Sequence, residues 1–239
     1  MSLPLRSFAE AAPFIAARVR QAVLERGRCD LVLAGGNTPR FVYERLASGE
    51  AGPIPWERVR LFWGDERFVP HDHPASNYRL ARESLLERLQ PPGPQVFPVP
   101  TGEAGPEQAA RRYERTLREL LPGRAFPAFD LVLLGLGADG HTASLFPGGP
   151  EGEERTRWCL VSRAPEGVAV RERITLSLPA LSAARAVAFL VAGEDKRAAL
   201  QSLLDPALPL EKALPAQRLR AARSGLQAAG ELFCFTDLL

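Results

Sequence analysis

The sequence predicts an α/β fold: one domain over residues 1–239, with a mostly parallel sheet flanked by helices on both faces. The main observation is that short apolar runs alternate along the chain with amphipathic, helix-forming segments, which is typical of right-handed β–α–β units. The second is length. A chain of 239 residues fits one large domain or two small ones, and no repeat, low-complexity tract or linker divides it.

The first half of the chain supplies two helices and two strands in alternation, after an N-terminal helix. Ser7 and Glu10 have the spacing of a capping box, and the helix that they begin runs to Gly27, although Pro13 lies inside it. The apolar run Cys29–Gly35 predicts a buried strand. The same reasoning predicts a helix over 39–47, a strand over 59–66 (VRLFWGDE) and an amphipathic helix over 76–89.

The second half continues the alternation. A helix over 106–121 has Pro106 in its first turn, where proline is tolerated, and FDLVLLGLG (129–137) is the most apolar strand. The remaining predicted elements are the strands WCLVS (158–162), RITLSL (173–178), AVAFLVAG (186–193) and LFCFTD (232–237), with a helix over 194–204.

Composition excludes several classes of function. The net charge of +2 gives no basic face for nucleic acid, and the apolar runs are strand-sized, too short to span a membrane. The N-terminal segment lacks the apolar core of a signal peptide. Cys29, Cys159 and Cys234 are odd in number and far apart, which is typical of reduced thiols. We therefore expect a cytoplasmic protein with no membrane or nucleic-acid partner.

Gly135, Gly137 and Gly140 form a literal G-x-G-x-x-G after an apolar run. A dinucleotide site needs a long helix that begins at the third glycine, so that its amides face the pyrophosphate. Here Pro147 and Pro150 interrupt the chain within ten residues of Gly140, and the expected acid about 20 residues on is missing. We interpret these glycines as allowing close approach of the backbone to a small ligand.

Four polar loops follow predicted strands: GGNTP, GDER, GADGHTAS and GEDK. The carboxyl ends of parallel strands meet at one edge of a sheet, where such sheets bind ligands. The sequence therefore predicts one crevice that gathers Asn37, Thr38, Asp65, Glu66, Arg67, Asp139, His141 and Lys196.

The GGNTP loop offers backbone amides and a hydroxyl before a helix, which suits a phosphate. Its alternative is an ordinary turn, with Thr38 as N-cap and Pro39 at the first helical position. Both interpretations can hold, because the capping amides are those that a phosphate would use. Arg173 and Lys196 are candidate counter-charges, and the alternative for each is a solvated surface cation.

His141 follows Asp139 by two residues on a loop that leaves a buried strand, which favours a catalytic role. A zinc site shared with His71 and His73 is the alternative, but neither spacing is diagnostic. Ser144 lacks the G-x-S-x-G setting of an acyl-serine nucleophile. The acids of GDER are either functional, or solvated or paired with the arginine of the same loop.

Six segments, in order along the chain, resemble those of the 6-phosphogluconolactonase family: LAGGNTP, FWGDERFVP, SNYRLARESLL, FDLVLLGLGADGHTASLFPG, RITLSLPAL and GEDKRAAL. The resemblance covers nearly the whole chain. It implies hydrolysis of 6-phosphogluconolactone, the second step of the oxidative pentose phosphate pathway, without a metal or organic cofactor. It also implies the modified Rossmann-like fold shared with glucosamine-6-phosphate deaminases. We expect a sugar phosphate as the partner, and a monomer or weak homodimer.

The resemblance also implies roles for single residues. His141 matches the proposed general base, with Asp139 beside it, and Arg67 and Asp65 match the family's DER residues. The expected phosphate contacts are Gly36, Asn37, Thr38, Arg173 and Lys196, with serine commoner in the family at the Asn37 position.

Two rival functions remain at this point. A glucosamine-6-phosphate deaminase places a catalytic glutamate several residues beyond the loop histidine, whereas here no acid occurs until Glu151. A non-catalytic sugar-phosphate sensor usually carries a helix-turn-helix, for which this chain has no spare length.

Overall fold

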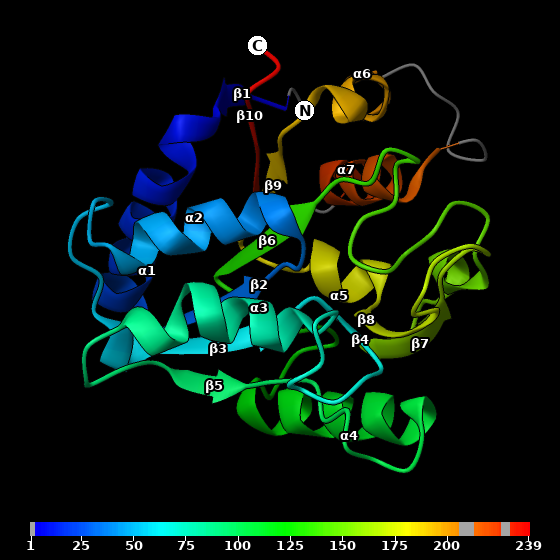
Figure 1. Ribbon diagram of the computed structural model, residues 1–239, viewed down its shortest axis with the longest axis horizontal. Helices are drawn as coiled ribbons and strands as arrows, with labels where there is room; N and C mark the ends of the chain where they lie inside the picture. Colours follow the sequence, from blue (N-terminus) through cyan, green and yellow to red (C-terminus); the bar gives the residue numbers. More distant parts are fainter. Residues whose placement is uncertain (1–2, 206–212, 226–229) are drawn as a thin grey trace.

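The computed structural model describes residues 3–205, 213–225 and 230–239. Its centre is a seven-stranded sheet in which every neighbouring pair of strands is parallel, as predicted (Figure 1). In spatial order the strands are β1 (Leu5–Ser7), β10 (Glu231–Thr236), β9 (Ala186–Val191), β6 (Leu131–Gly135), β2 (Cys29–Leu33), β3 (Val59–Trp63) and β5 (Gln95–Phe97). Pairing of β1 with β10 brings the two ends of the chain side by side (Figure 1).

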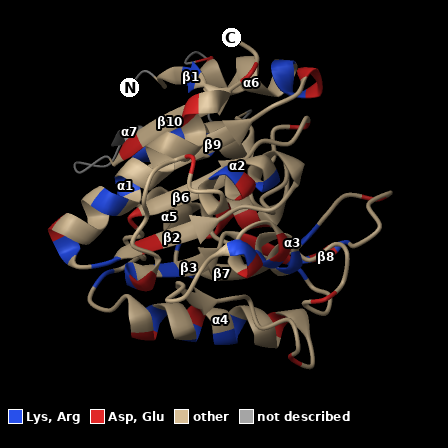
Figure 2. Ribbon diagram, turned by 60° about the vertical axis from the view of Figure 1, so that its left-hand side comes forward, with Lys and Arg blue, Asp and Glu red and all other residues tan. Residues whose placement is uncertain are grey.

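Every residue of β2 and β9 is buried, which shows that both faces of the central strands are covered. The helices are α1 (Ala11–Arg26), α2 (Asn37–Ala47), α3 (Asn77–Ser84), α4 (Pro106–Leu120), α5 (Leu178–Ser182), α6 (Arg197–Leu204) and α7 (Pro215–Gly225). In Figure 2 the strands β6 and β9 carry no charged residue, while α4 is banded with both signs of charge. This contrast separates the apolar core from the solvated helix surfaces. Within the described residues, no helix combines the length and the apolar character needed to cross a bilayer.

A second, three-stranded antiparallel sheet contains β4 (Asp65–Arg67), β8 (Glu172–Leu176) and β7 (Cys159–Arg163). The expectation that VRLFWGDE forms one strand is therefore wrong, because the chain changes sheets at Gly64. The Gly64 N–H donates to the Leu33 carbonyl at 3.0 Å, and its own carbonyl accepts from Leu176 N–H at 2.8 Å. Gly64 thus joins the two sheets.

Helix boundaries differ from the sequence expectation at four places. Ser7 N–H donates to Glu10 Oε1 at 3.3 Å, but a 3₁₀ turn (Phe8–Glu10) precedes α1, which ends at the left-handed Gly27 as predicted. The segment over 76–89 is α3 followed by a 3₁₀ turn, and that over 194–204 begins as a 3₁₀ turn before α6. Helix α2 begins two residues earlier than expected, so Gly36 and not Thr38 is its N-cap.

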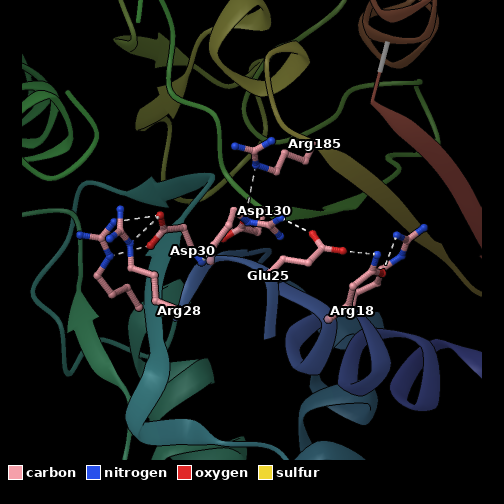
Figure 3. A network of polar contacts seen from close by, with 9 residues as sticks. Arg18, Glu25, Arg28, Asp30, Asp130 and Arg185 are labelled. Carbon is pink, nitrogen blue, oxygen red and sulfur yellow. Dashed lines mark hydrogen bonds and ion pairs between the residues drawn. The ribbon is translucent and has the colours of Figure 1, made fainter. Parts of the chain in front are cut away.

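A charged network holds the other end of the sheet together (Figure 3). Asp30, on β2, accepts from Arg60 Nε at 2.5 Å and from Arg60 Nη2 at 2.8 Å. Asp130, directly before β6, accepts from the Asp30 amide and from Arg26 Nε, both at 2.8 Å, and pairs with Arg185 at 3.3 Å. Burial raises the pKa of Asp130, against the opposing effects of the Asp30 amide and Arg26. We interpret this network as structural, because it lies at the amino ends of β2 and β6.

Candidate active site

The four predicted loops meet at one cavity of about 490 Å³, at the carboxyl ends of β2, β3, β6 and β9. Eight of the ten residues predicted for the site line it: Gly36, Asn37, Thr38, Asp65, Arg67, His141, Arg173 and Lys196. Asp139 does not line the cavity but is bonded to His141, and Glu66 does not line it either. Residues 160 positions apart in sequence are therefore brought together as the strand order predicts.

The first turn of α2 presents backbone donors to the cavity. Its N-cap, Gly36, has a φ of 97°, a left-handed conformation that favours glycine, and no side chain caps the helix. Pro39 has no N–H, so the free donors of this turn belong to Asn37 and Thr38, both of which line the cavity. A helix N-terminus of this kind carries partial positive charge and suits a phosphate.

Two arginines face each other across the small sheet. The antiparallel register places Arg67 on β4 directly opposite Arg173 on β8, on the same face. Arg67 donates from Nη1 to the Ala75 carbonyl at 2.6 Å, and the buried Nε atoms of both arginines lack an acceptor. Among the described residues, Arg173 forms no ion pair or hydrogen bond through its guanidinium.

Arg173 is only 7% exposed, so the alternative of a solvated surface cation is wrong for this residue. Burial, followed by the charge of Arg67, lowers the pKa of Arg173, and Asp65 and Glu66 offset this only in part. A buried cation without a partner is unfavourable. The arrangement is therefore one that an anion in the cavity would stabilise.

Lys196 is the third cation of the cavity, and it differs from the arginine pair. It ends the 3₁₀ turn that follows β9, and its Nζ lies 2.9 Å from the Asp195 carboxylate. Its side chain is partly exposed and its partner is well exposed, so solvent weakens this pairing. Lys196 remains able to turn toward an anion in the cavity.

Asp139 and His141 form a hydrogen-bonded pair at the end of β6. The His141 Nδ1 and Asp139 Oδ1 atoms are 2.6 Å apart, and the same oxygen accepts the His141 backbone N–H at 3.1 Å. Partial burial acts to raise the pKa of Asp139, but its bonds to the His141 amide and ring hold that pKa below its usual value. With Nδ1 directed at a carboxylate, Nε2 is the nitrogen left to accept a proton. The ring packs against Phe146 at a centroid distance of 5.0 Å.

One of the fingerprint glycines, Gly137, makes room for this pair. A Cβ on Gly137 would lie 2.1 Å from His141 Nδ1 and 2.5 Å from Asp139 Oδ1, so only glycine fits there. Gly140 has a left-handed φ of 83°. No helix begins at Gly140, because residues 136–149 form turns and an isolated bridge. The helix that a dinucleotide site needs is therefore absent after Gly140, and Gly137 makes room for the histidine instead.

The two acids of GDER are buried and neither pairs with the Arg67 guanidinium, so the alternative of solvated or Arg67-paired acids is wrong. Glu66 is buried and caps α3: it accepts from the amides of Asn77 at 2.7 Å and Tyr78 at 2.8 Å. Burial raises the pKa of Glu66 despite these amides. Asp65 accepts from Ser144 Oγ at 2.6 Å and from Asn77 Nδ2 at 3.3 Å. Both carboxylates hold the walls of the cavity in place.

Asn77 and Ser144 line the cavity and were not among the predicted site residues. The sequence offered weak signals only. Asn77 follows the N-cap of α3 within the segment SNYRLARESLL, and Ser144 follows the histidine by three residues. Neither signal could show that both side chains contact Asp65.

Two buried tyrosines, also missed from the sequence, fix the strand ends that carry the loops. The Tyr43 hydroxyl accepts from Ala34 N–H at 2.8 Å and donates to the Ala34 carbonyl at 2.7 Å, just after β2. The Tyr113 hydroxyl makes the same pair of bonds with Trp63 at the end of β3. Burial raises the pKa of both hydroxyls. Each tyrosine hydroxyl thus bonds the backbone groups that a neighbouring strand would otherwise bond, at the point where the strand pairing ends.

We expect Tyr43→Phe to lower the free energy of unfolding by about 1–3 kcal/mol, because the Ala34 N–H and carbonyl would be left buried without partners. Urea denaturation followed by circular dichroism measures this change. Tyr78→Phe is the matched control, since the Tyr78 hydroxyl makes no hydrogen bond with the described residues. Equal midpoints for the Tyr43 variant and the wild type would contradict the role given to this hydroxyl.

The histidines of the zinc alternative are engaged elsewhere. His71 Nε2 lies 2.8 Å from the Val99 carbonyl oxygen, and its ring packs on Tyr78. His73 Nδ1 accepts from Ala75 N–H at 3.0 Å. Within residues 3–205, 213–225 and 230–239, no three His, Cys, Asp or Glu side chains come together as a metal site.

Comparison with known proteins identifies relatives over most of the chain. Residues 6–228 match the family described as glucosamine-6-phosphate isomerases/6-phosphogluconolactonase. The chain is 44% identical over 194 residues to the 6-phosphogluconolactonase of Synechocystis sp., covering 80% of this chain and 78% of that protein. It is 42% identical over 207 residues to the rat 6-phosphogluconolactonase, covering 84% and 77%.

Solved structures agree with these sequence relatives. The 6-phosphogluconolactonase from Trypanosoma brucei superposes with a TM-score of 0.83 at 30% identity, covering 98% of this chain and 95% of that one. The 6-phosphogluconolactonase from Thermotoga maritima gives 0.79 at 30% identity, covering 98% of both chains. A monomeric glucosamine-6-phosphate deaminase, at 20% identity and a TM-score of 0.78, shares the fold.

Proposed function

The chain belongs to the glucosamine-6-phosphate isomerase/6-phosphogluconolactonase family, and from this premise we propose that it hydrolyses 6-phospho-D-glucono-1,5-lactone to 6-phospho-D-gluconate. This reaction is the second step of the oxidative pentose phosphate pathway. The observation that carries the proposal is the cavity itself. It places a histidine–aspartate pair, two arginines without an ion pair and a lysine around one space of about 490 Å³.

The phosphate of the substrate binds where positive charge converges. The free backbone N–H groups of Asn37 and Thr38, in the first turn of α2, donate hydrogen bonds to some of the phosphate oxygens. Arg173 and Lys196 supply the counter-charge, and the buried, unpaired state of Arg173 supports this assignment. With the phosphate anchored there, the lactone ring lies across the cavity with its ester carbon at His141.

His141 acts as the general base. Its Nε2 takes a proton from a water molecule as the water oxygen attacks the lactone carbonyl, while Asp139 accepts a hydrogen bond from Nδ1 and orients the ring. The tetrahedral intermediate then collapses, and the bond between C1 and the ring oxygen breaks. The ring oxygen takes up the proton from the imidazolium. The products are the open-chain acid and the regenerated histidine.

Arg67 or a nearby backbone amide stabilises the oxyanion that forms on the carbonyl oxygen. A well-placed donor of this kind contributes about 3–4 kcal/mol to transition-state stabilisation. General-base catalysis contributes about 10²–10⁴-fold in rate. A six-membered lactone is a reactive ester, so these two contributions suffice for the proposed step without a covalent nucleophile or a metal ion.

The deaminase alternative finds less support at this site. Its chemistry needs an acid shortly after the loop histidine, and here the next acid is Glu151. Glu151 lies in a 3₁₀ turn (Pro150–Glu153) and does not line the cavity. The lactonase reaction uses groups that the cavity does present.

Two assays on the purified protein separate these functions. In the first, 6-phosphogluconolactone is generated in situ and the formation of 6-phosphogluconate is followed against its spontaneous hydrolysis. In the second, release of ammonia from glucosamine 6-phosphate is measured. We expect acceleration in the first assay alone. Ammonia release without lactone hydrolysis would contradict the proposal, and binding of 6-phosphogluconate with no turnover would favour a sensor.

We place the activity in the cytoplasm, in an environment that keeps thiols reduced. Cys29, Cys159 and Cys234 are all buried and unpaired, and burial raises the pKa of each thiol. Buried, protonated thiols are unreactive, as expected of structural cysteines in reducing compartments. We expect a monomer or weak homodimer, which sedimentation velocity would measure.

A further inference from the structure

We propose that Ser144 is a positioning residue: it holds the Asp65 carboxylate away from the Arg67–Arg173 pair, and so keeps both guanidiniums free for an anionic ligand. The inference deepens the proposed function and rests on it, because the ligand is taken to be a phosphorylated sugar acid or its lactone. It gives a role to a serine that the lactonase mechanism leaves unused.

The small sheet brings Asp65 close to the two arginines. Asp65 and Arg67 are two residues apart on β4, so their side chains project from the same face. Arg173 lies opposite Arg67, and Thr175 lies opposite Asp65, again on this face. Proximity of the charges is consistent with the effect of Asp65 on Arg173, whose pKa it raises against the effect of burial.

Asp65 nevertheless forms no ion pair with either arginine. Its Oδ2 accepts from the Ser144 hydroxyl at 2.6 Å, and its Oδ1 accepts from Asn77 Nδ2 at 3.3 Å. Each carboxylate oxygen is therefore bound by a neutral donor, and the carboxylate is fixed in orientation. The arginines, left without Asp65, keep their buried Nε atoms unpaired.

Ser144 is itself held firmly enough to do this. Its three polar groups bond to three different strands of the small sheet: the hydroxyl to Asp65 on β4, the N–H to Thr175 Oγ1 on β8 at 3.3 Å, and the carbonyl to Ser162 Oγ on β7 at 2.5 Å. Ser144 is 2% exposed, and all three partners are buried. The residue before it, Ala143, has a φ of 48°, which is rare outside glycine. Such a backbone persists only where its surroundings fix it.

The test is anion binding by the full chain with Ser144→Ala. Without the hydroxyl, Asp65 loses the donor at Oδ2 and turns toward the guanidiniums, which then compete less well for an anion. We expect the Kd of 6-phosphogluconate, measured by isothermal titration calorimetry, and the KM of the lactone to rise by about tenfold or more, the scale of one charged hydrogen bond. The kcat value is expected to fall as well, because Arg67 is the proposed oxyanion donor.

A double-mutant cycle with Asp65→Asn separates positioning from a general structural effect. If Ser144 acts by restraining the Asp65 charge, Ser144→Ala weakens binding in the wild type and has little further effect in the Asp65→Asn background. Equal weakening in both backgrounds, or a Ser144→Ala protein that binds 6-phosphogluconate as the wild type does, would overturn the proposal.

Two further variants keep the test decisive. Ser84→Ala is the matched control, since Ser84 is a fully buried serine whose hydroxyl bonds to the Leu80 carbonyl and which does not line the cavity; its KM and Kd should not change. Ser144→Cys has nearly the native shape but a weak donor, so it reports on the hydroxyl where the alanine variant folds poorly. It too should weaken binding, and native affinity would contradict the proposal.

The binding measurement is independent of turnover. A wild-type protein that binds 6-phosphogluconate but does not hydrolyse the lactone would contradict the proposed function and leave the Ser144 test intact. A covalent acyl intermediate on Ser144, detected by mass spectrometry of the quenched enzyme, would overturn the positioning role.

Discussion

Replacing His141 with asparagine is expected to lower kcat for lactone hydrolysis by about 10²–10⁴-fold, with KM nearly unchanged. Asparagine retains a polar side chain that can reach Asp139 but has no basic nitrogen, so the attacking water loses its proton acceptor. The proposed phosphate contacts lie elsewhere in the cavity, on α2 and on Arg173, so binding should survive. Initial rates of 6-phosphogluconate formation, corrected for spontaneous hydrolysis, measure the effect.

The matched control is His73→Asn. His73 makes a local contact with the Ala75 amide and does not line the cavity, so this variant should keep the wild-type rate. Because the pKa of Asp139 lies below its usual value, the carboxylate stays ionised until lower pH than a free aspartate would. A His141→Asn enzyme at full rate would exclude this base.

Arg173→Met is expected to lower kcat/KM by about 10- to 100-fold, chiefly through KM, and at the same time to stabilise the folded protein. The activity loss follows from removing a charged donor to the phosphate. The gain in stability follows because the free protein buries this cation without a partner and beside Arg67. Replacing buried charges by apolar side chains of similar volume is often stabilising, here by about 1 kcal/mol.

Thermal unfolding with and without 6-phosphogluconate tests both halves of this prediction. Without ligand, the Tm of Arg173→Met should exceed that of the wild type; saturating ligand should raise the wild-type Tm more than that of the variant. Arg163→Met is the control, since Arg163 is exposed on β7 and pairs loosely with Glu172 at 3.6 Å. A lower Tm together with an unchanged KM would contradict the assignment of Arg173.

The parallel sheet could be predicted because its central strands are buried on both faces and read as continuous apolar runs. The small antiparallel sheet could not be predicted from the sequence. The apolar runs of β7 and β8 fit either sheet. Their place in the small sheet depends on pairing with each other and with β4, after the chain leaves the large sheet at Gly64. The edge strands β1 and β5 have three residues each, which is too few for an alternation of apolar and polar residues to be recognised. Helix α7 was also missed.

The part of the site that lies at the strand ends could be predicted from the sequence. Loops after parallel strands must converge, so the meeting of Asn37, Asp65, His141 and Lys196 needed no coordinates. The facing arginines depend on the register of β4 against β8, which no local pattern encodes. The same is true of the contact between Ser144 and Asp65, 79 residues apart.

A crystal structure of the protein with 6-phosphogluconate bound tests the central claim most directly, because the ligand has an anion at each end. We expect the phosphate to lie against the first turn of α2, Arg173 and Lys196, with the C1 carboxylate about 3 Å from His141 Nε2. The reverse orientation, or a histidine ring turned away from C1, would contradict it.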